Sequence, residues 1–256
     1  MVERQNHFIR RSAWPRVVLR AERLSASGVL DMRRVNRRRF VRYGVGSVIA
    51  ATLGIVLGYF LIGRHQQSPG TRRLPPGQSE VQALQVLHVG RVPNINIDEW
   101  TFEVYGEVEN PLRFNWDQFL QLPKTVDVSE FDCVTGWTRL DNRWEGVRFK
   151  DIAKLARPTV KAKYATIECS DDVAYTTSLP LGDLLSDGVL FAYGLDGKPL
   201  PSEHGGPLRL VVPRKYAYKS AKWVRRVKFT ERQELGFWEI RGYSNTADPW
   251  TNDRFG

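Results

Sequence analysis

The segment Phe131-Asp132-Cys133-Val134-Thr135-Gly136-Trp137 lies near the middle of this 256-residue chain and holds one of its two cysteines. Further on come the segments Trp144-Glu145-Gly146-Val147, His204-Gly205-Gly206-Pro207-Leu208-Arg209 and Lys219-Ser220-Ala221-Lys222-Trp223. A thiolate is a soft ligand that suits a redox metal. A His, an Arg and a Lys in the same half of the chain suit an anionic, phosphate-bearing ligand. The order of these segments carries our interpretation of the fold.

Taken in order, these segments resemble the sulfite oxidase family of molybdopterin enzymes. The set is Cys-Val-x-x-Trp, Trp-x-Gly-Val, Asp-Gly-Lys-Pro-Leu, His-Gly-Gly-Pro-x-Arg, Val-Pro-Arg-Lys-Tyr and Lys-Ser-Ala-Lys-Trp. The resemblance covers residues 81–256 and points to the bacterial branch that includes the methionine sulfoxide reductase catalytic subunits. It implies a molybdenum-cofactor-dependent oxidoreductase that uses Mo-molybdopterin for oxygen-atom transfer.

The positive charge of the chain is concentrated at its N-terminus. The formal net charge is +10, but residues 1–42 carry +9 of it and the other 214 residues carry only +1. A domain that is almost neutral is unlike a nucleic-acid-binding face, and a basic segment before an apolar one is typical of membrane topology. A nucleic-acid binder recruited by the Arg-rich tail stays an alternative, and it predicts salt-sensitive binding that disappears when residues 1–42 are deleted.

Residues 43–63 form a run of 21 residues without a charge, bracketed by Arg42 and Arg64. A helix of that length spans roughly 30 Å, the thickness of a bilayer core. The preceding stretch, Asn36-Arg37-Arg38-Arg39-Phe40-Val41-Arg42, resembles a twin-arginine export signal. Since no small-x-small cleavage site follows, we expect an uncleaved single-pass anchor in the cell membrane, with the domain on the periplasmic or extracytoplasmic side.

These features divide the chain into a basic cytoplasmic tail (1–42), a transmembrane helix or signal anchor (43–63), a Pro/Gly-rich linker (64–80) and a catalytic domain (81–256). Within the domain, apolar patterning and turn residues predict strands and short helices without a regular βαβ rhythm, and therefore a mixed α+β fold. The predicted strands are 100–108, 126–133, 164–169, 175–179, 189–193, 208–212 and 223–229. The predicted helices are 116–122, capped by Asn115, then 149–156 and 181–185.

Cys133 is predicted to end a strand or to lie in the loop after it, where a ligand is held rigidly and still faces a cavity. The cysteine count leaves two interpretations open, because Cys133 and Cys169 outside the cytoplasm could also form a structural disulfide. The resemblance favours Cys133 as the thiolate ligand of molybdenum. A buried, unreactive thiol is the alternative for Cys133 alone.

The resemblance also assigns the residues that bind the cofactor. His204 and Arg209 match positions that contact the pterin and its phosphate, and the Lys222 segment matches the phosphate cradle. His88 matches an entry loop that touches the pterin, with Arg91 beside it, and Cys169 aligns with a cofactor-binding Thr. Tyr243 falls where relatives place an aromatic residue near the substrate. The expected cofactor-binding residues are His88, Cys169, His204, Arg209, Ser220, Ala221 and Lys222, and the expected catalytic residues are Cys133 and Tyr243.

No Cys-x-x-Cys-His haem-attachment pattern occurs in the sequence. The resemblance therefore implies an external haem-containing electron partner, either a membrane subunit or a soluble cytochrome. Eukaryotic relatives that oxidise sulfite place paired arginines after the cysteine, whereas this chain has Val134-Thr135-Gly136. We therefore expect a small-molecule or protein sulfoxide, or another sulfur oxo-compound, as substrate. A sulfite dehydrogenase remains an alternative, with charge supplied by Arg139, Arg143, Arg214 and Lys215, and so does a non-catalytic membrane-tethered binding module with a Cys133–Cys169 disulfide.

Overall fold

The structure is a computed structural model that describes residues 73–256. The predicted tail, the predicted membrane anchor and most of the predicted linker lie outside these residues. Within residues 73–256, no helix combines the length and the apolar character needed to cross a membrane.

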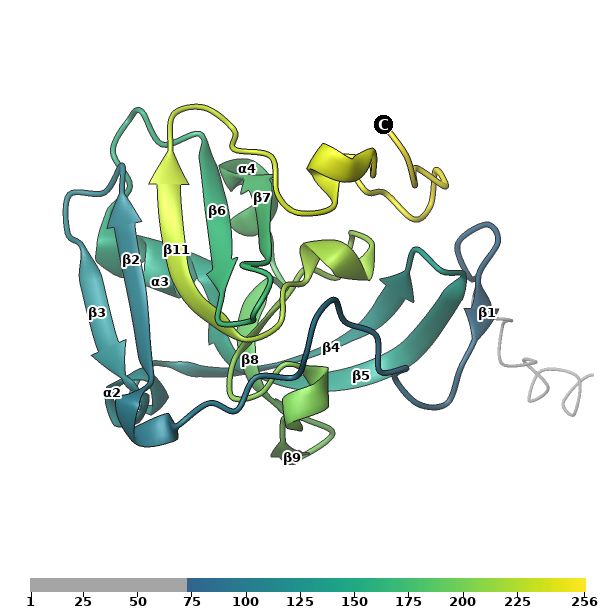
Figure 1. Cartoon of the computed structure of the whole chain (residues 1–256), viewed down its shortest axis with the longest axis horizontal. Coiled ribbons are helices and arrows are strands. Elements are labelled where there is room, and N and C mark those ends of the chain that lie inside the picture. The colour runs from purple at the N-terminus through teal and green to yellow at the C-terminus, as the bar shows by residue number, and fades with distance from the viewer. Residues whose placement is uncertain (1–72) are drawn as a thin grey trace, which may run out of the picture. The chain divides into compact units, whose positions relative to one another are not determined.

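One of two sheets has five strands in the order β3-β2-β11-β6-β7 and forms the left part of Figure 1. Strand β11 pairs in parallel with β2, and the other pairs are antiparallel. The parallel pair joins segments more than a hundred residues apart, so the C-terminal part of the domain completes a sheet begun at its N-terminal part. The strands are β2 (Thr101–Gly106), β3 (Leu112–Asn115), β6 (Tyr164–Cys169), β7 (Thr176–Pro180) and β11 (Val224–Thr230).

The second sheet has six strands and is organised around one long hairpin, β4–β5, which extends away from the five-stranded sheet (Figure 1). Strand β5 pairs with β4 along its length, with β1 at its start and with β8 at its end. This arrangement presents the tip of the hairpin beyond the main core. The strands are β1 (Ser79–Glu80), β4 (Lys124–Cys133), β5 (Trp137–Arg148), β8 (Leu190–Leu195), β9 (Lys198–Pro199) and β10 (Arg209–Val211).

The helices are short and fill the corners between strands. The α-helices are α2 (Trp116–Leu120), α3 (Phe149–Ala156) and α4 (Leu181–Leu184), and the 3₁₀ helices are η1 (Ile97–Glu99), η2 (Ser202–His204), η3 (Ala217–Lys219) and η4 (Glu239–Arg241). Asn115 caps α2 in a capping box with Gln118, which satisfies two backbone N–H groups that would otherwise lack acceptors. Helix α3 buries Phe149, Ile152 and Ala153 on one face.

The main hydrophobic core joins the five-stranded sheet, helices α2 and α3, and strands β8 and β10. A second cluster lies under the hairpin and contains Phe131, Cys133, Trp137 and Trp144. Cys133 thus belongs to the hydrophobic cluster under the hairpin, whereas Cys169 packs against the main core. Cys133 lies in the six-stranded sheet and Cys169 lies in the five-stranded sheet.

The mixed α+β fold predicted from the sequence is confirmed. The strand that ends at Cys133, the helix 149–156 and the strand 164–169 all occur, and Asn115 caps the predicted helix, which ends at Leu120. Sequence patterning missed β5 because its middle carries Arg139, Asn142 and Arg143, without an apolar alternation. Asn142 is fully buried there and donates hydrogen bonds to the carbonyl oxygens of Ser129 and Arg139 (2.9 and 2.7 Å).

Candidate active site

Cys133 is the last residue of β4, and its side chain lines a cavity of about 320 Å³. The thiol is buried, with 7% of the residue exposed. Within residues 73–256, no three His, Cys, Asp or Glu side chains gather as a metal-ligand group. A metal bound by Cys133 would therefore take its other ligands from a cofactor or from solvent.

The loop after Cys133 is a three-residue hairpin connection that fixes the direction of the thiol. Cys133 pairs with Trp137 across the loop, and the Gly136 N–H donates to the Cys133 carbonyl oxygen at 3.0 Å. Gly136 has a φ of 100°, a conformation that glycine adopts without the steric cost of a Cβ atom. Gln78 Nε2 also donates to the Cys133 carbonyl oxygen (3.0 Å), and Arg254 Nη1 donates to that of Val134 (2.8 Å).

Two cations line the same cavity without a carboxylate partner. Within the described part of the chain, neither Arg209 nor Lys222 forms an ion pair. Burial lowers the pKa of Arg209 to about 9. Burial, with the charge of Arg209 as the next cause, lowers the pKa of Lys222 to about 7, while the charge of Glu203 and, less strongly, Cys133 oppose that shift. A bound anion would relieve this electrostatic cost.

The environment of Arg209 holds the guanidinium in one orientation. Its N–H groups donate to the carbonyl oxygens of His204 (2.8 Å), Ser220 (2.9 Å) and Leu210 (3.4 Å). Its Cζ atom also lies 4.8 Å from the ring centroid of Phe131 and 5.4 Å from that of Trp144. Since a guanidinium has five N–H donors, two remain for a ligand in the cavity.

The backbone beside these cations offers further donors. Within residues 73–256, the N–H groups of Ala221 and Lys222 donate to no protein acceptor, although Ala221 is 2% exposed. A buried N–H group without an acceptor is rare and points to a ligand or ordered water. The Ser220 hydroxyl accepts from the Val212 N–H at 2.9 Å and so anchors the segment to β10. The residues present therefore fit a phosphate-bearing cofactor.

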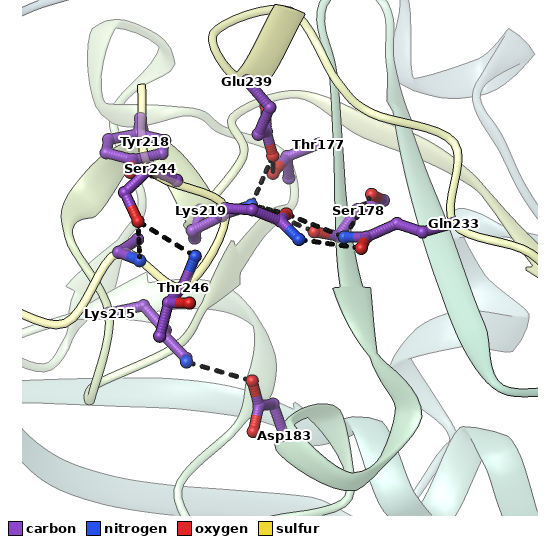
Figure 2. A network of polar contacts seen from close by, with 12 residues as sticks. Thr177, Ser178, Asp183, Lys215, Tyr218, Lys219, Gln233, Glu239, Ser244 and Thr246 are labelled. Carbon is purple, nitrogen blue, oxygen red and sulfur yellow. Dashed lines mark hydrogen bonds and ion pairs between the residues drawn. The ribbon is translucent and has the colours of Figure 1, made fainter. Parts of the chain in front are cut away.

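The two lysines of the Lys-Ser-Ala-Lys-Trp segment have different roles. Lys219 is fully buried and pairs with Glu239 at 2.5 Å, and it also donates to the Ser178 carbonyl oxygen (3.1 Å). The Thr177 hydroxyl donates to the same Glu239 oxygen at 2.7 Å. Figure 2 shows these side chains converging between β7 and the C-terminal segment. Lys219 therefore holds the segment against β7 and Glu239, whereas Lys222 lines the cavity.

Aromatic side chains form another part of the cavity wall, which we call the aromatic wall. The ring centroids of Trp238 and Tyr243 lie 4.8 Å apart, and those of Tyr218 and Tyr243 lie 5.4 Å apart. The Tyr218 and Tyr175 hydroxyls donate to the carbonyl oxygens of Ser244 (2.6 Å) and Tyr218 (2.5 Å). The Tyr243 hydroxyl makes no hydrogen bond to the residues described and is available to a substrate. Asp171 is the carboxylate of this cavity, and burial raises its pKa.

The cavity brings together eight of the nine site residues predicted from sequence. They are His88, Cys133, His204, Arg209, Ser220, Ala221, Lys222 and Tyr243. Cys169 does not line it: the side chain packs against the main core, and burial raises the thiol pKa well above its ordinary value. Arg91 is also outside the cavity, and its backbone N–H donates to Asp172 Oδ1 at 3.1 Å.

Several cavity residues were not singled out from the sequence. They are the hydroxyl of Thr135, the carboxylate of Asp171, and the aromatic side chains of Tyr175, Tyr218 and Trp238. Thr135 lies within the segment around Cys133, so its position in sequence was an available signal. The aromatic wall comes from loops distant in sequence, and no local pattern marked these residues.

Comparison with known proteins agrees with this geometry. Residues 89–238 match the family described as "Oxidoreductase molybdopterin binding domain". An uncharacterized oxidoreductase of Bacillus subtilis, YuiH, is 42% identical over 194 residues, which cover 75% of this chain and 97% of that protein. His88 and Tyr243 line the cavity but lie just outside the matched range.

More distant relatives have named activities. The protein-methionine-sulfoxide reductase catalytic subunit MsrP of Xanthomonas axonopodis pv. citri is 32% identical over 158 residues, 56% of this chain and 49% of that protein. The chain thus spans about half the length of this relative.

Among solved structures, the sulfane dehydrogenase SoxCD from Paracoccus pantotrophus has the same fold. The TM-score is 0.51 at 24% identity, with 55% of this chain and 40% of that chain covered. Together, the match to the molybdopterin-binding family and the extensive similarity to YuiH show that this chain belongs to the molybdopterin-binding oxidoreductases of the sulfite oxidase family.

Proposed function

We propose that this oxidoreductase transfers an oxygen atom to or from a sulfur compound, with a sulfoxide as the substrate reduced. The observation that carries the proposal is the placement of Cys133 in one cavity with Arg209 and Lys222, two cations without carboxylate partners. The MsrP relative is named as a methionine sulfoxide reductase catalytic subunit, which supports the substrate class.

We assign different cavity residues to binding the cofactor and to positioning the substrate. Cys133 would hold molybdenum as a thiolate, and the bound cofactor would supply two-electron oxygen-atom-transfer chemistry. Arg209, Lys222 and the free Ala221 N–H would bind the phosphate of the pterin. Trp238 and Tyr243 exclude water from the reacting sulfur, and aromatic rings make favourable contacts with sulfur. The Tyr243 hydroxyl donates a hydrogen bond to the sulfoxide oxygen.

The distribution of charge favours a neutral substrate over sulfite. The cations that could have formed an additional anion pocket are directed elsewhere: Arg139 pairs with Asp196 at 2.5 Å, and Lys215 pairs with Asp183 at 3.0 Å. Neither these residues nor Arg143 and Arg214 line the cavity. Both cysteines are free in the structure, which removes the disulfide that a non-catalytic binding module required.

Molybdenum content and turnover test this function. The full chain would be produced in a host that makes molybdopterin, beside Cys133→Ser and the matched control Cys169→Ser. We expect about one molybdenum per chain in the parent and the control, and loss of sulfoxide reduction with a viologen donor in Cys133→Ser. A folded parent protein without metal or pterin would overturn the proposal. Turnover of sulfite with ferricyanide, and none of sulfoxide, would establish the sulfite dehydrogenase instead.

Residues 43–63 anchor the domain at the outer face of the membrane, and a haem-containing protein exchanges electrons with it there. The proposal rests on the charge-free run and on the paired arginines before it. Arg37→Lys/Arg38→Lys should keep the domain inaccessible to protease in spheroplasts, because twin-arginine export reads the paired guanidinium groups. Arg33→Lys/Arg34→Lys is the control. Protease access unchanged by the first pair would contradict the export route.

A further inference from the structure

The hydroxyl of Thr135 lies against the sulfur of Cys133. Thr135 Oγ1 and Cys133 Sγ are 3.1 Å apart, within hydrogen-bonding distance for a sulfur acceptor, and both side chains line the cavity. Among residues 73–256, Thr135 Oγ1 has no other hydrogen-bond partner. No other acceptor in this part of the chain therefore competes for the hydroxyl proton.

The backbone that carries the two side chains is held by hydrogen bonds, while Thr135 itself is an exposed residue. The loop between Cys133 and Trp137 is closed by the Gly136 N–H at 3.0 Å. Gln78 and Arg254, from the two ends of the described chain, bind the carbonyl oxygens of Cys133 and Val134 at 3.0 and 2.8 Å. These three anchors fix the backbone positions from which the two side chains approach each other.

The chemistry of the two groups sets the direction of the hydrogen bond. A cysteine that ligates a metal is a thiolate, which can only accept. The Thr135 O–H must then be the donor. A hydrogen bond to a ligand sulfur withdraws electron density from it, and this stabilises the more reduced state of the metal.

We infer that Thr135 is a positioning residue that donates an O–H···S hydrogen bond to the Cys133 thiolate and thereby raises the reduction potential of the bound metal. The inference rests on the proposed function, since it requires Cys133 to be the metal ligand. If Thr135 served only to form the turn, removal of its hydroxyl would leave the reduction potential of the metal unchanged. The role inferred here requires the hydroxyl.

The test compares two variants that lack the hydroxyl, Thr135→Val and Thr135→Ala, with Thr135→Ser, which keeps it. Thr251→Val is the control, because Thr251 is exposed and its hydroxyl bonds only to the Asp248 carbonyl oxygen. Molybdenum content is measured first for each full-length protein. The midpoint potential is then measured by redox titration, followed by electron paramagnetic resonance of the metal.

We expect full metal content throughout, with potentials shifted to more negative values in the Val and Ala variants and restored in Thr135→Ser. The shift should correspond to about a tenfold change in a one-electron equilibrium constant, or about 59 mV. Fully loaded Val and Ala variants with the parent's potential would overturn the role of Thr135 alone. A parent protein without molybdenum would overturn the proposed function, and this inference with it.

Discussion

At the scale of single residues, the cavity is lined by cationic side chains whose burial is unfavourable for folding. Lys222 is held among Arg209, His204 and Trp223, and its Nζ donates only to the Glu203 carbonyl oxygen at 2.6 Å. Burial and the neighbouring cations also lower the pKa of His204. Charges without partners are costly in a folded protein unless a ligand neutralises them. Such a cost is typical of binding sites, where local rules of stability give way to function.

Lys222→Met should stabilise the cofactor-free protein and abolish cofactor retention. The folded pKa of about 7 lies below the ordinary 10.5, so the unfolded chain binds more protons between these values. The unfolding free energy of the parent protein should therefore rise with pH across that window, and the slope should be smaller in Lys222→Met. Urea unfolding at several pH values measures both. Lys161→Met, at an exposed position, should leave the slope unchanged, and an equal slope in both variants would contradict the assignment.

At the scale of elements, the β4–β5 hairpin sets the direction of Cys133. Gly146, in the Trp-x-Gly-Val segment, lies at an irregularity in the pairing of β5 with β8, and a Cβ atom there would overlap the Phe191 carbonyl oxygen. At the hairpin tip, Gly136 supplies the left-handed conformation that the three-residue loop requires. The glycines of these segments are therefore explained by backbone geometry.

Gly136→Ala should destabilise the protein by about 1–2 kcal/mol, because an L-residue is strained at a φ of 100°. A Cβ atom would also lie 3.3 Å from the Gly77 carbonyl oxygen. The matched control is Gly182→Ala in α4, where a Cβ atom meets nothing within 4 Å and helix propensity favours Ala by roughly 0.5–1 kcal/mol. Thermal unfolding of both variants gives the comparison, and equal effects would argue against strain at the hairpin tip.

At the scale of the whole molecule, a buried ion pair connects three distant parts of the chain. Lys219 belongs to the segment that carries the free N–H groups, Thr177 and Ser178 belong to β7, and Glu239 begins η4 in the C-terminal segment. Glu239 Oε2 is buried without a partner. Burial lowers the pKa of Lys219, and Glu239 is the main opposing influence. The pair therefore ties the basic segment to β7 and to η4, whose N-cap residue is Trp238 of the cavity wall.

Glu239→Ala should cost about 3–5 kcal/mol of unfolding free energy, because it leaves a buried ammonium group without a counter-charge. The double variant Lys219→Met/Glu239→Leu should lose much less, since it removes both charges. Glu109→Ala breaks an exposed pair with Arg157 and should cost less than about 1 kcal/mol. Urea titrations would measure all three, and a double variant as unstable as Glu239→Ala would show that packing, not charge, is what the pair contributes.

Much of this architecture could be predicted from local pattern. The end of β4 at Cys133 and the capped helix after Asn115 follow from short-range periodicity and capping chemistry, which depend on neighbouring residues only. The same segments, taken in order, predicted the cofactor class and most of the cavity. Strand β5 could not be predicted this way, because its polar side chains bond to distant residues: Asn142 donates to the Ser129 carbonyl oxygen in β4, and Arg139 donates to Asp196 after β8.

Packing between distant segments determined the rest. The sequence offers Lys219 and Lys222 as similar candidates, and the placement of Glu239 separates a structural lysine from one that faces the cavity. The resemblance led us to expect Cys169 among the cofactor-binding residues, whereas its side chain packs against the main core and does not line the cavity. Side-chain type and spacing are local quantities, whereas burial and counter-charge depend on which distant segments meet. The sequence by itself therefore determined which residue types the site contains. The tertiary structure decided which of them line the cavity and which hold the surrounding segments in place, because that depends on packing between distant segments.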